Sequence, residues 1–267
     1  MGEEHAVMGE GPVEIDTSKP HAARVYDRLL GGKDNYPVDE AVAARLPPEA
    51  AEGARQNRAF MHRAVRWLAR EGVDQFLDIG TGIPTEPNLH QVVQEVNPAA
   101  RVVYADNDPI VLAHAQALLV SHPDGATHYL PADVREPDKL LARAAEHLDL
   151  SRPVGLSLIA ILHFFPDETG AYELVRTLTG ALAPGSHLVL THSAYDLFPR
   201  ELEASAAAYA KGGIAMALRD HAAVARFFEG LDLVAPGLVT VTEWDEGGAP
   251  ALDVPRGGLY AGVGRVR

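Results

Sequence analysis

Between residues 75 and 193, short apolar runs alternate with segments whose apolar residues recur at helical spacing. The apolar runs are QFLDIG, RVVYADND, ATHYLPADV, PVGLSLIAILHF and SHLVLTHS. Strands that alternate with helices predict a parallel sheet with helices on both faces, and near-continuous apolar runs are typical of its central strands. The sequence therefore predicts an α/β fold of the Rossmann-like, doubly wound kind.

The segments on either side of this alternation complete the predicted architecture, a mostly parallel seven-stranded sheet with an N-terminal helical cap. The first residues are polar, acidic and glycine-containing, which is typical of a disordered tail. We expect a tail of residues 1–16 and a single domain of residues 17–267. Within that domain we expect a helical cap (17–70), a ligand-binding core (71–198), a helical insertion (199–229) and C-terminal strands (230–267).

Composition restricts the classes of partner. The formal net charge is −14, and because phosphate binding needs a basic surface, we expect no nucleic-acid partner. The chain has no cysteine and its twelve histidines are scattered, so we predict no disulfide and no metal site. The N-terminal residues do not resemble a signal peptide and no run of about 18 apolar residues occurs. We therefore expect a cytoplasmic protein that does not enter a membrane.

The stretch QFLDIGTGIPTEPN joins the first predicted strand to a glycine turn. In an open parallel sheet, ligands bind beyond the carboxyl ends of the strands, and glycine lets the backbone turn sharply and approach a ligand. A dinucleotide loop has a third glycine at the mouth of a helix, but Thr85 stands there, and Pro84 and Pro87 delay the helix. The turn at Gly80 and Gly82 is therefore poorly suited to pyrophosphate.

Asp78, just before the glycines, indicates the charge of the ligand. Its carboxylate would repel an anionic pyrophosphate and favour a cationic ammonium or sulfonium. A plain strand and turn without a ligand is the alternative. The rim IPTEPN is expected to be extended up to a helix at Leu89, because a residue before proline is biased away from helix. Its side chains Thr85, Glu86 and Asn88 are hypothesised to touch the ligand.

Two further acidic residues end the next two strands. Asp106 follows the second strand, where a carboxylate can accept both ribose hydroxyls. Asp108 either joins it or caps the helix that begins at Pro109. Asp133 follows the third strand and is placed to accept from an adenine amine, with helix capping or an exposed turn as the alternative. Acidic residues at three consecutive strand ends favour an adenosine with a cationic tail.

This order of motifs resembles the class I S-adenosylmethionine-dependent methyltransferases over about residues 70–195. FLDIGTG is similar to their first motif, VYADND to their ribose-binding segment, PADV to their adenine-edge segment and LAPGSHLVLTH to the turn before their fifth strand. The resemblance implies that the core binds S-adenosyl-L-methionine as cofactor. The residues it implies for that role are Asp78, Gly80, Thr81, Gly82, Thr85, Asp106, Asn107, Asp108, Asp133, Val134 and Ala160.

A narrower resemblance spans nearly the whole chain. ARVYDRLLGGKDNYPVDE, NRAFMHRAVRWLA, QFLDIGTGIPTEPNLHQV, VVYADNDPIVLAHAQALL and the terminal YAGVGR are similar to an actinobacterial family. That family is labelled S-adenosyl methyltransferase and was formerly catalogued as a domain of unknown function. The label implies cofactor binding, but it supplies no methyl acceptor.

The acceptor is expected above the ends of the fourth and fifth strands, beneath the cap. His163 in AILHFF follows the fourth strand, and in many enzymes of the resembled fold this segment lines the active site. An ordinary histidine pKa of about 6.5 suits a general base, so His163 is the candidate catalytic residue. A histidine packed among its aromatic neighbours is the alternative. His192 and Tyr195 follow the fifth strand and are further candidates to line the pocket.

The polar segment GGKDNY beside apolar helices suits a lid over a cofactor, and we hypothesise that Tyr26 and Arg58 face the pocket. Ion pairs on a solvated helix surface are the alternative. The leading interpretation is methyl transfer from S-adenosylmethionine to a small-molecule acceptor that the sequence does not identify. A non-catalytic sensor or scaffold that binds S-adenosylmethionine or S-adenosylhomocysteine is the alternative. A nicotinamide oxidoreductase is a distant third, because the third glycine is missing.

Overall fold

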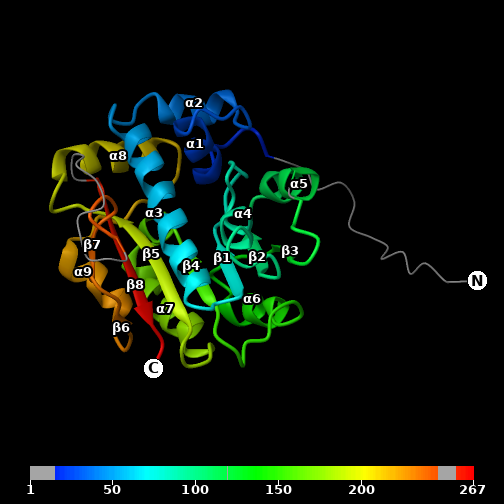
Figure 1. Cartoon of the computed structure of the whole chain (residues 1–267). Helices are drawn as coiled ribbons and strands as arrows, with labels where there is room; N and C mark the ends of the chain where they lie inside the picture. The colour runs from blue at the N-terminus through cyan, green and yellow to red at the C-terminus, as the bar shows by residue number, and fades with distance from the viewer. Residues whose placement is uncertain (1–15, 119, 246–256) are drawn as a thin grey trace, which may run out of the picture.

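The computed structural model describes residues 16–118, 120–245 and 257–267 and contains one sheet with helices on both sides (Figure 1). Of the expected tail, only Asp16 lies within the described residues. The strands are β1 (Gln75–Ile79), β2 (Arg101–Asp106), β3 (Ala126–Pro131), β4 (Gly155–Leu158), β5 (His187–Ser193), β6 (Asp232–Leu233), β7 (Val239–Thr240) and β8 (Leu259–Arg265).

The α-helices are α1 (Ala22–Leu29), α2 (Pro37–Ala43), α3 (Ala50–Arg70), α4 (Leu89–Gln94), α5 (Pro109–Leu118), α6 (Pro137–Ala144), α7 (Ala171–Gly180), α8 (Pro199–Lys211) and α9 (His221–Ala225). Short 3₁₀ helices are η1 (Leu162–Phe164), η2 (Asp167–Thr169) and η3 (Arg226–Phe228). Strands and helices alternate from β1 to β5, which confirms the predicted α/β fold.

The strand order is β3-β2-β1-β4-β5-β8-β6, with β7 also paired to β8. Strands β1 to β5 are parallel, and β8 runs antiparallel to β5. The direction of winding reverses at β1, which lies between β2 and β4. A ligand crevice is therefore expected beyond the carboxyl ends of these three strands.

The sheet has eight strands rather than the seven that the sequence predicts. The difference lies at one edge, where β6 and β7 pair with two successive parts of β8. Between them, Pro236 has no N–H to donate to the ladder, and Gly237 has a φ of 95° that departs from extended backbone. One expected strand is therefore divided into two short ones.

Alternate residues of each strand face opposite sides of the sheet. On one side, Ala64 and Leu68 of α3 pack with Phe76 of β1 in a buried cluster that α4 also joins. On the other side, Leu77 and Ile79 of β1 pack with residues of α6 and α7. Because Asp78 lies between Leu77 and Ile79 in an extended strand, its side chain faces α3 and α4.

Helices α1 and α2 lie above the carboxyl ends of the parallel strands, with α8 beside α2 (Figure 1). The buried Arg24 of α1 donates from Nε to Oδ2 of Asp108 (3.1 Å), just beyond β2. Val25 of α1, Val42 of α2 and Tyr209 of α8 form a small core of their own. α1 and α2 therefore form the helical cap, whereas α3 packs on the sheet.

Candidate functional site

The turn after β1 is tied to the end of β2. Gly80 (φ 72°) and Gly82 (φ 68°) both have a left-handed backbone conformation that favours glycine. The Gly80 N–H donates to Ala105 O (2.8 Å), and the Gly82 N–H donates to Oδ2 of Asp106 (2.9 Å). The two glycines expected to bind the cofactor are therefore held against the acidic residue expected to bind its ribose.

The two glycines have different surroundings. A Cβ atom on Gly80 would lie 2.3 Å from Cδ1 of Ile161, so the turn touches the segment after β4. A Cβ atom on Gly82 would meet Ala23 of the cap at 3.9 Å, which is ordinary van der Waals contact. A side chain at Gly80 would therefore displace Ile161, whereas the Cα of Gly82 borders space between the turn and α1.

Asp78 is buried on the α3 side of the sheet. Burial raises the pKa of its carboxyl to about 6, and the charge of Arg58 opposes that rise. In the strand register Asp78 lies beside Tyr104 of β2 and Ser157 of β4, and Tyr104 lies beside Tyr129 of β3. Four polar side chains therefore form a row across the sheet next to the glycine turn.

One side chain of this row is buried without a partner. The Tyr129 hydroxyl has no hydrogen-bond partner among the residues that the structure describes, whereas the Ser157 hydroxyl faces Asp78 and opposes the rise of its pKa. Buried polar groups in proteins nearly always have one, and a polar ligand or an ordered water commonly supplies it. The row around Asp78 is therefore suited to bind polar, positively charged groups. Thr81 donates its hydroxyl to Asp78 O (3.0 Å) and stiffens the turn.

The residues that follow β2 have three different environments. Asp106 is buried and accepts the Gly82 N–H on Oδ2 and the Asp108 N–H on Oδ1, both at 2.9 Å. Burial raises its pKa, while these N–H donors oppose the rise. Asp108 accepts the Ile110 N–H on Oδ1 (3.0 Å) and so caps α5, which is one of its two expected roles. Asn107 is exposed.

At the end of β3, Asp133 lies in a partly exposed turn. Arg135 donates to it from Nε (2.9 Å) and Nη2 (2.5 Å), and these bonds lower the pKa of Asp133. Val134 is buried in the cluster on the α6 and α7 side. The Ala132 N–H donates to Asp106 O (3.0 Å), which holds this turn beside the end of β2.

Ala160, two residues after the end of β4, has a φ of 55° and is the one non-glycine residue with positive φ in the described part of the chain. Strained backbone of this kind clusters at functional sites. Its N–H donates to Oγ1 of Thr191 in β5 (2.8 Å). Ala160 therefore lies between the carboxyl ends of β4 and β5, at the edge where the acceptor is expected.

His163 in η1 is buried against Phe164 and His192, with ring centroids at 4.4 and 5.7 Å. Its Nδ1 has no partner among residues 16–118, 120–245 and 257–267. Burial lowers its pKa well below 6.5, and the neighbouring His192 and Arg219 lower it further. The ring is therefore neutral at physiological pH, with a nitrogen that is free to accept, but it is a weak base.

His192 is the last residue but one of β5 and is fully buried. Nη1 of Arg219 approaches its Nε2 at 2.8 Å, and its Nδ1 is 2.9 Å from Ser193 O. Because a guanidinium only donates, Nε2 is the acceptor and Nδ1 carries the proton. Burial lowers the pKa of His192 to about 4. The ring is therefore a fixed acceptor rather than a free base.

Arg219 is a central residue that the sequence pattern did not indicate. Its buried guanidinium also donates to Leu162 O (3.0 Å) and Phe165 O (2.6 Å), and it forms an ion pair with Asp167 (2.5 Å). These contacts join the segment after β4 to the end of β5. Because the partners of Arg219 are far away in the sequence, no local signal identified it.

Two residues predicted to line the pocket have hydroxyl groups that are bonded to a neighbouring helix instead of standing free. The Tyr26 hydroxyl donates to Ala54 O (3.0 Å) and accepts from Nδ2 of Asn57 (2.9 Å), which links α1 to α3. The Tyr195 hydroxyl donates to Oε1 of Glu203 in α8 (2.9 Å). Each is anchored close to the carboxyl edge of the sheet.

Arg58 of α3 holds the IPTEPN rim. Its Nη2 donates to Thr85 O (2.5 Å) and to Pro87 O (2.8 Å), and His62 binds Pro87 O through Nε2 (2.9 Å). The Thr85 N–H donates to Oδ1 of Asn88, the residue that precedes α4 (3.1 Å). The rim ends where α4 begins, as predicted, and α3 determines its position.

The GGKDNY segment wraps around the carboxylate of Asp27. Oδ2 accepts the Asp34 N–H (3.0 Å) and Nδ2 of Asn35 (2.8 Å). A Cβ atom on Gly32 would lie 1.9 Å from Oδ1, so a side chain cannot be accommodated there. Burial raises the pKa of Asp27. This carboxylate therefore organises the segment from within and does not belong to a solvated surface.

Among the residues that the structure describes, no group of three or more histidine, cysteine, aspartate or glutamate side chains is arranged to hold a metal ion. No helix there is long and apolar enough to cross a lipid bilayer.

The strand order, the antiparallel β8 and the acidic residues at the ends of β1, β2 and β3 define the fold class of the class I S-adenosylmethionine-dependent methyltransferases. The chain belongs to the S-adenosyl methyltransferase family, whose model matches residues 8–267. This match confirms the narrower resemblance found in the sequence, and with it the cofactor of the family, S-adenosylmethionine.

Solved structures are similar to this chain over most of its length. A DUF574 family protein from Streptomyces avermitilis MA-4680 is 45% identical, with a TM-score of 0.90 over 95% of this chain and 100% of that one. A protein from Thermobifida fusca YX, provisionally assigned as a methyltransferase, is 38% identical, with a TM-score of 0.83 over 94% and 97%.

A more distant structure shares the fold alone. The magnesium protoporphyrin IX methyltransferase of Synechocystis PCC 6803, solved with bound S-adenosylhomocysteine, is 14% identical, with a TM-score of 0.54 over 91% of this chain and 93% of that one. No curated protein matches the sequence.

Proposed function

We propose that this protein transfers the methyl group of S-adenosylmethionine to a small-molecule acceptor in the cytoplasm. The observation that carries the proposal is the position of two buried carboxylates, Asp78 and Asp106, beside the Gly80–Gly82 turn. This turn follows β1, the strand at which the direction of winding of the sheet reverses. Membership in the S-adenosyl methyltransferase family supports the same reaction. The formal net charge of −14 favours a metabolite over a nucleic acid as acceptor.

The residues at the turn fit this cofactor. The carboxyl of Asp78, with a pKa of about 6, is ionised at neutral pH and complements a cationic ammonium or sulfonium. Asp106 supplies a second carboxylate for hydroxyl groups. Gly82 has no side chain that would block the approach of a ligand to its backbone. The unpartnered hydroxyl of Tyr129 is a further group that a polar ligand can satisfy.

S-adenosylmethionine, when bound, supplies an electrophilic methyl group on a positively charged sulfur. The main task of the chain is then to orient the acceptor and exclude water, since a donor of this kind is already activated. His163 is the candidate for receiving a proton, through Nδ1. Because its pKa is well below 6.5, His163 suits an acceptor that reacts without a strong base. No specific observation favours a non-catalytic binder over an enzyme.

Methyl transfer is tested with S-adenosylmethionine carrying a tritiated methyl group and a whole bacterial extract that retains its metabolites, separated afterwards into small molecules, protein and RNA. We expect label in the small-molecule fraction with the parent protein and background label with Asp106→Ala. Isothermal titration with S-adenosylmethionine and S-adenosylhomocysteine accompanies the assay. Label in RNA or protein would contradict the small-molecule acceptor. Failure to bind either compound would contradict the cofactor site, and binding without transfer would favour the sensor.

A further inference from the structure

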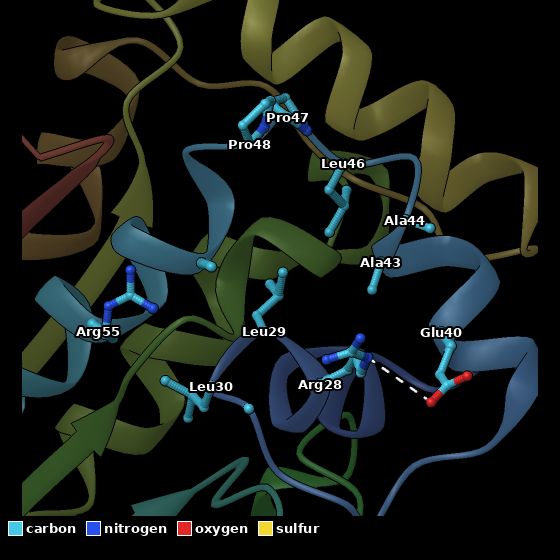
Figure 2. Close-up of a pocket in the computed structure, with 12 residues that line it drawn as sticks. Arg28, Leu29, Leu30, Glu40, Ala43, Ala44, Leu46, Pro47, Pro48 and Arg55 are labelled. Atoms are coloured by element: carbon cyan, nitrogen blue, oxygen red, sulfur yellow. Dashed lines mark ion pairs between the residues drawn. The ribbon is translucent and has the colours of Figure 1, made fainter.

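The cap contains a pocket that is lined by none of the strand-end residues of the cofactor site. Its volume is about 530 Å³, within the range of small-molecule sites. Its walls come from α1, α2, the loop after α2 and the start of α3 (Figure 2). Leu29, Leu46 and Pro47 contribute apolar surface, and Arg28, Glu40 and Arg55 are the charged residues of the lining.

The wall of this pocket contains more arginine than glutamate side chains, with two arginines and one glutamate in the lining. Glu52, outside the lining, pairs with Arg55, so the arginines are available to an anion by exchange of partners and not through an excess of positive charge. Figure 2 shows Arg28 and Arg55 on different sides of the cavity, with Leu29 between them. A ligand that bridges the cavity would therefore meet apolar surface in the middle and a guanidinium at either side.

The two arginines have partners that a ligand can replace. Nε of Arg28 lies 3.9 Å from Oε1 of Glu40, and both side chains are about half exposed. Arg55 pairs with Glu52 on the exposed surface of its own helix (2.8 Å). Exposed pairs of this kind contribute little to stability, whereas a guanidinium binds an oxyanion through two parallel hydrogen bonds. Arg28 and Arg55 can therefore turn toward an anion at small cost.

A layer of packed side chains separates this pocket from the segment after β4. Ala43 and Leu46 of the wall pack on the small core of Val25, Val42 and Tyr209 in the cap. Phe164 also packs against this core, and its ring contacts His163. The pocket in the cap and the crevice at the strand ends are therefore two separate places.

We propose that the pocket in the cap binds a small organic anion with an apolar body, at a site distinct from that of the cofactor. The wall supplies apolar contact for the body and guanidinium groups for the oxyanion. The proposal does not rest on the proposed methyl transfer, because the pocket is formed by the cap alone. It can therefore be tested in the absence of S-adenosylmethionine.

The probe is 1-anilinonaphthalene-8-sulfonate, an aromatic body with one sulfonate, whose fluorescence rises on binding to the folded protein. We expect saturable binding that octanoate displaces and that octylamine does not. Arg28→Ala and Arg55→Ala should each weaken the affinity about fivefold. Glu40→Gln should strengthen it about threefold, because it removes a competing carboxylate from Arg28. Arg45→Ala is the matched control, since it removes an exposed arginine outside the pocket lining.

A second pair of variants tests the cavity without changing charge. Ala44→Trp places a large side chain at an exposed position of the wall, and Ala41→Trp places the same side chain on α2 outside the lining. We expect the first to abolish saturable binding and the second to leave it unchanged, with equal thermal stability. Equal effects of Arg28→Ala and Arg45→Ala, or of the two tryptophan variants, would overturn the proposal. The affinity of Ala44→Trp for S-adenosylmethionine should equal that of the parent protein. This control distinguishes loss of the pocket in the cap from a failure of the cofactor site.

Discussion

The guanidinium of Arg219 donates a hydrogen bond to Nε2 of His192 across 2.8 Å and thereby joins the end of β5 to the segment after β4. The same group binds the carbonyl oxygens of Leu162, the first residue of η1, and of Phe165, the residue that follows η1. Between them lies His163, the candidate proton acceptor. Arg219 is therefore a positioning residue for the segment above which the methyl acceptor is expected.

Replacing Arg219 by methionine keeps much of the buried volume but removes every donor. Two buried carbonyl groups and the ring of His192 would then lack their partner, so we expect the free energy of unfolding to fall by about 3 kcal/mol. Urea denaturation followed by circular dichroism measures the loss. Arg176→Met is the control, because Arg176 pairs with Glu173 on an exposed helix surface, and it should change stability by less than about 1 kcal/mol. Equal losses of free energy of unfolding in the two variants would show that the buried hydrogen bonds of Arg219 contribute no more to stability than an exposed ion pair.

The ionised carboxylate of Asp78 should destabilise the folded protein and yet be necessary for binding the cofactor. Its pKa is about 6 when folded, against an ordinary value of 3.8. The folded state therefore holds its proton more tightly, and the stability from that proton is lost as pH rises from 3.8 through 6. At pH 7.5 this costs up to about 3 kcal/mol. We expect Asp78→Asn to exceed the parent protein in free energy of unfolding at pH 7.5 and to approach it at pH 4.

The same substitution should weaken the binding of S-adenosylmethionine by roughly tenfold or more, since a neutral amide no longer attracts a cation. Urea denaturation without cofactor and isothermal titration measure the two effects. Asp74→Asn, which removes a partly exposed carboxylate paired with Arg152, should leave the affinity unchanged. A less stable Asp78→Asn variant with normal affinity would assign Asp78 a purely structural role.

The sequence predicted the sheet because its signal is repeated: five apolar runs alternate with helices, and each run is a strand. Strands β6 and β7 have two residues each, which is too short for periodicity to appear, so the interruption at Pro236 was not predicted. The sequence also predicted the position of the glycine turn and of Asp106 at the end of a strand, because both features depend on local sequence.

Residues whose roles depend on distant partners could not be read in the same way. Arg219 contacts residues that precede it by 27 to 57 positions, and Arg24 contacts Asp108, 84 positions later. In the sequence, each arginine looks like part of a helical surface. Nothing local distinguishes a buried guanidinium from an exposed one, because only the packed fold brings its acceptors together. Asp133 is a milder case, since its bond to Arg135 competes with the adenine contact expected of it.

The two glycines of the turn should respond differently to alanine. Gly80→Ala combines a left-handed backbone with a Cβ atom 2.3 Å from Ile161, so we expect a loss of about 3 kcal/mol. Gly82→Ala has only the backbone cost of about 1–2 kcal/mol, because its Cβ atom meets Ala23 at 3.9 Å. The second variant should fold and yet bind S-adenosylmethionine more weakly, as its new methyl group enters the space that borders the turn.

A double-mutant cycle separates these contributions. In the Gly80→Ala background, Ile161→Ala should relieve the clash and restore part of the lost free energy of unfolding. In the Gly82→Ala background it should restore none. Urea denaturation and isothermal titration measure stability and affinity for all combinations. Strictly additive losses for Gly80→Ala and Ile161→Ala would mean that the turn and the segment after β4 are not in contact in solution. A Gly82→Ala variant with unchanged affinity would remove this turn from the cofactor site.

Stability should fall in mild acid because several histidines are buried in the neutral form. His187, at the start of β5, has an unpartnered Nδ1 within the described part of the chain and packs its ring against Trp67 at 5.7 Å. Burial, and to a smaller extent the charge of Arg265 in the neighbouring β8, lower its pKa to about 4. Burial likewise lowers the pKa of His62 and of His192 to about 4.

An unfolded histidine titrates near 6.5, so the folded state binds fewer protons between pH 6.5 and 4. The stability that these residues confer is complete above pH 6.5 and is lost as pH falls toward 4. His187→Leu removes one such proton while keeping an apolar contact with Trp67. We expect the variant to match the parent protein at pH 7.5 and to be more stable by about 2 kcal/mol at pH 4.5. Urea midpoints at pH 7.5, 6.0 and 4.5 test this, with the exposed His122→Leu as control. If the His187→Leu and parent curves stayed parallel across that range, His187 would not be a buried neutral histidine.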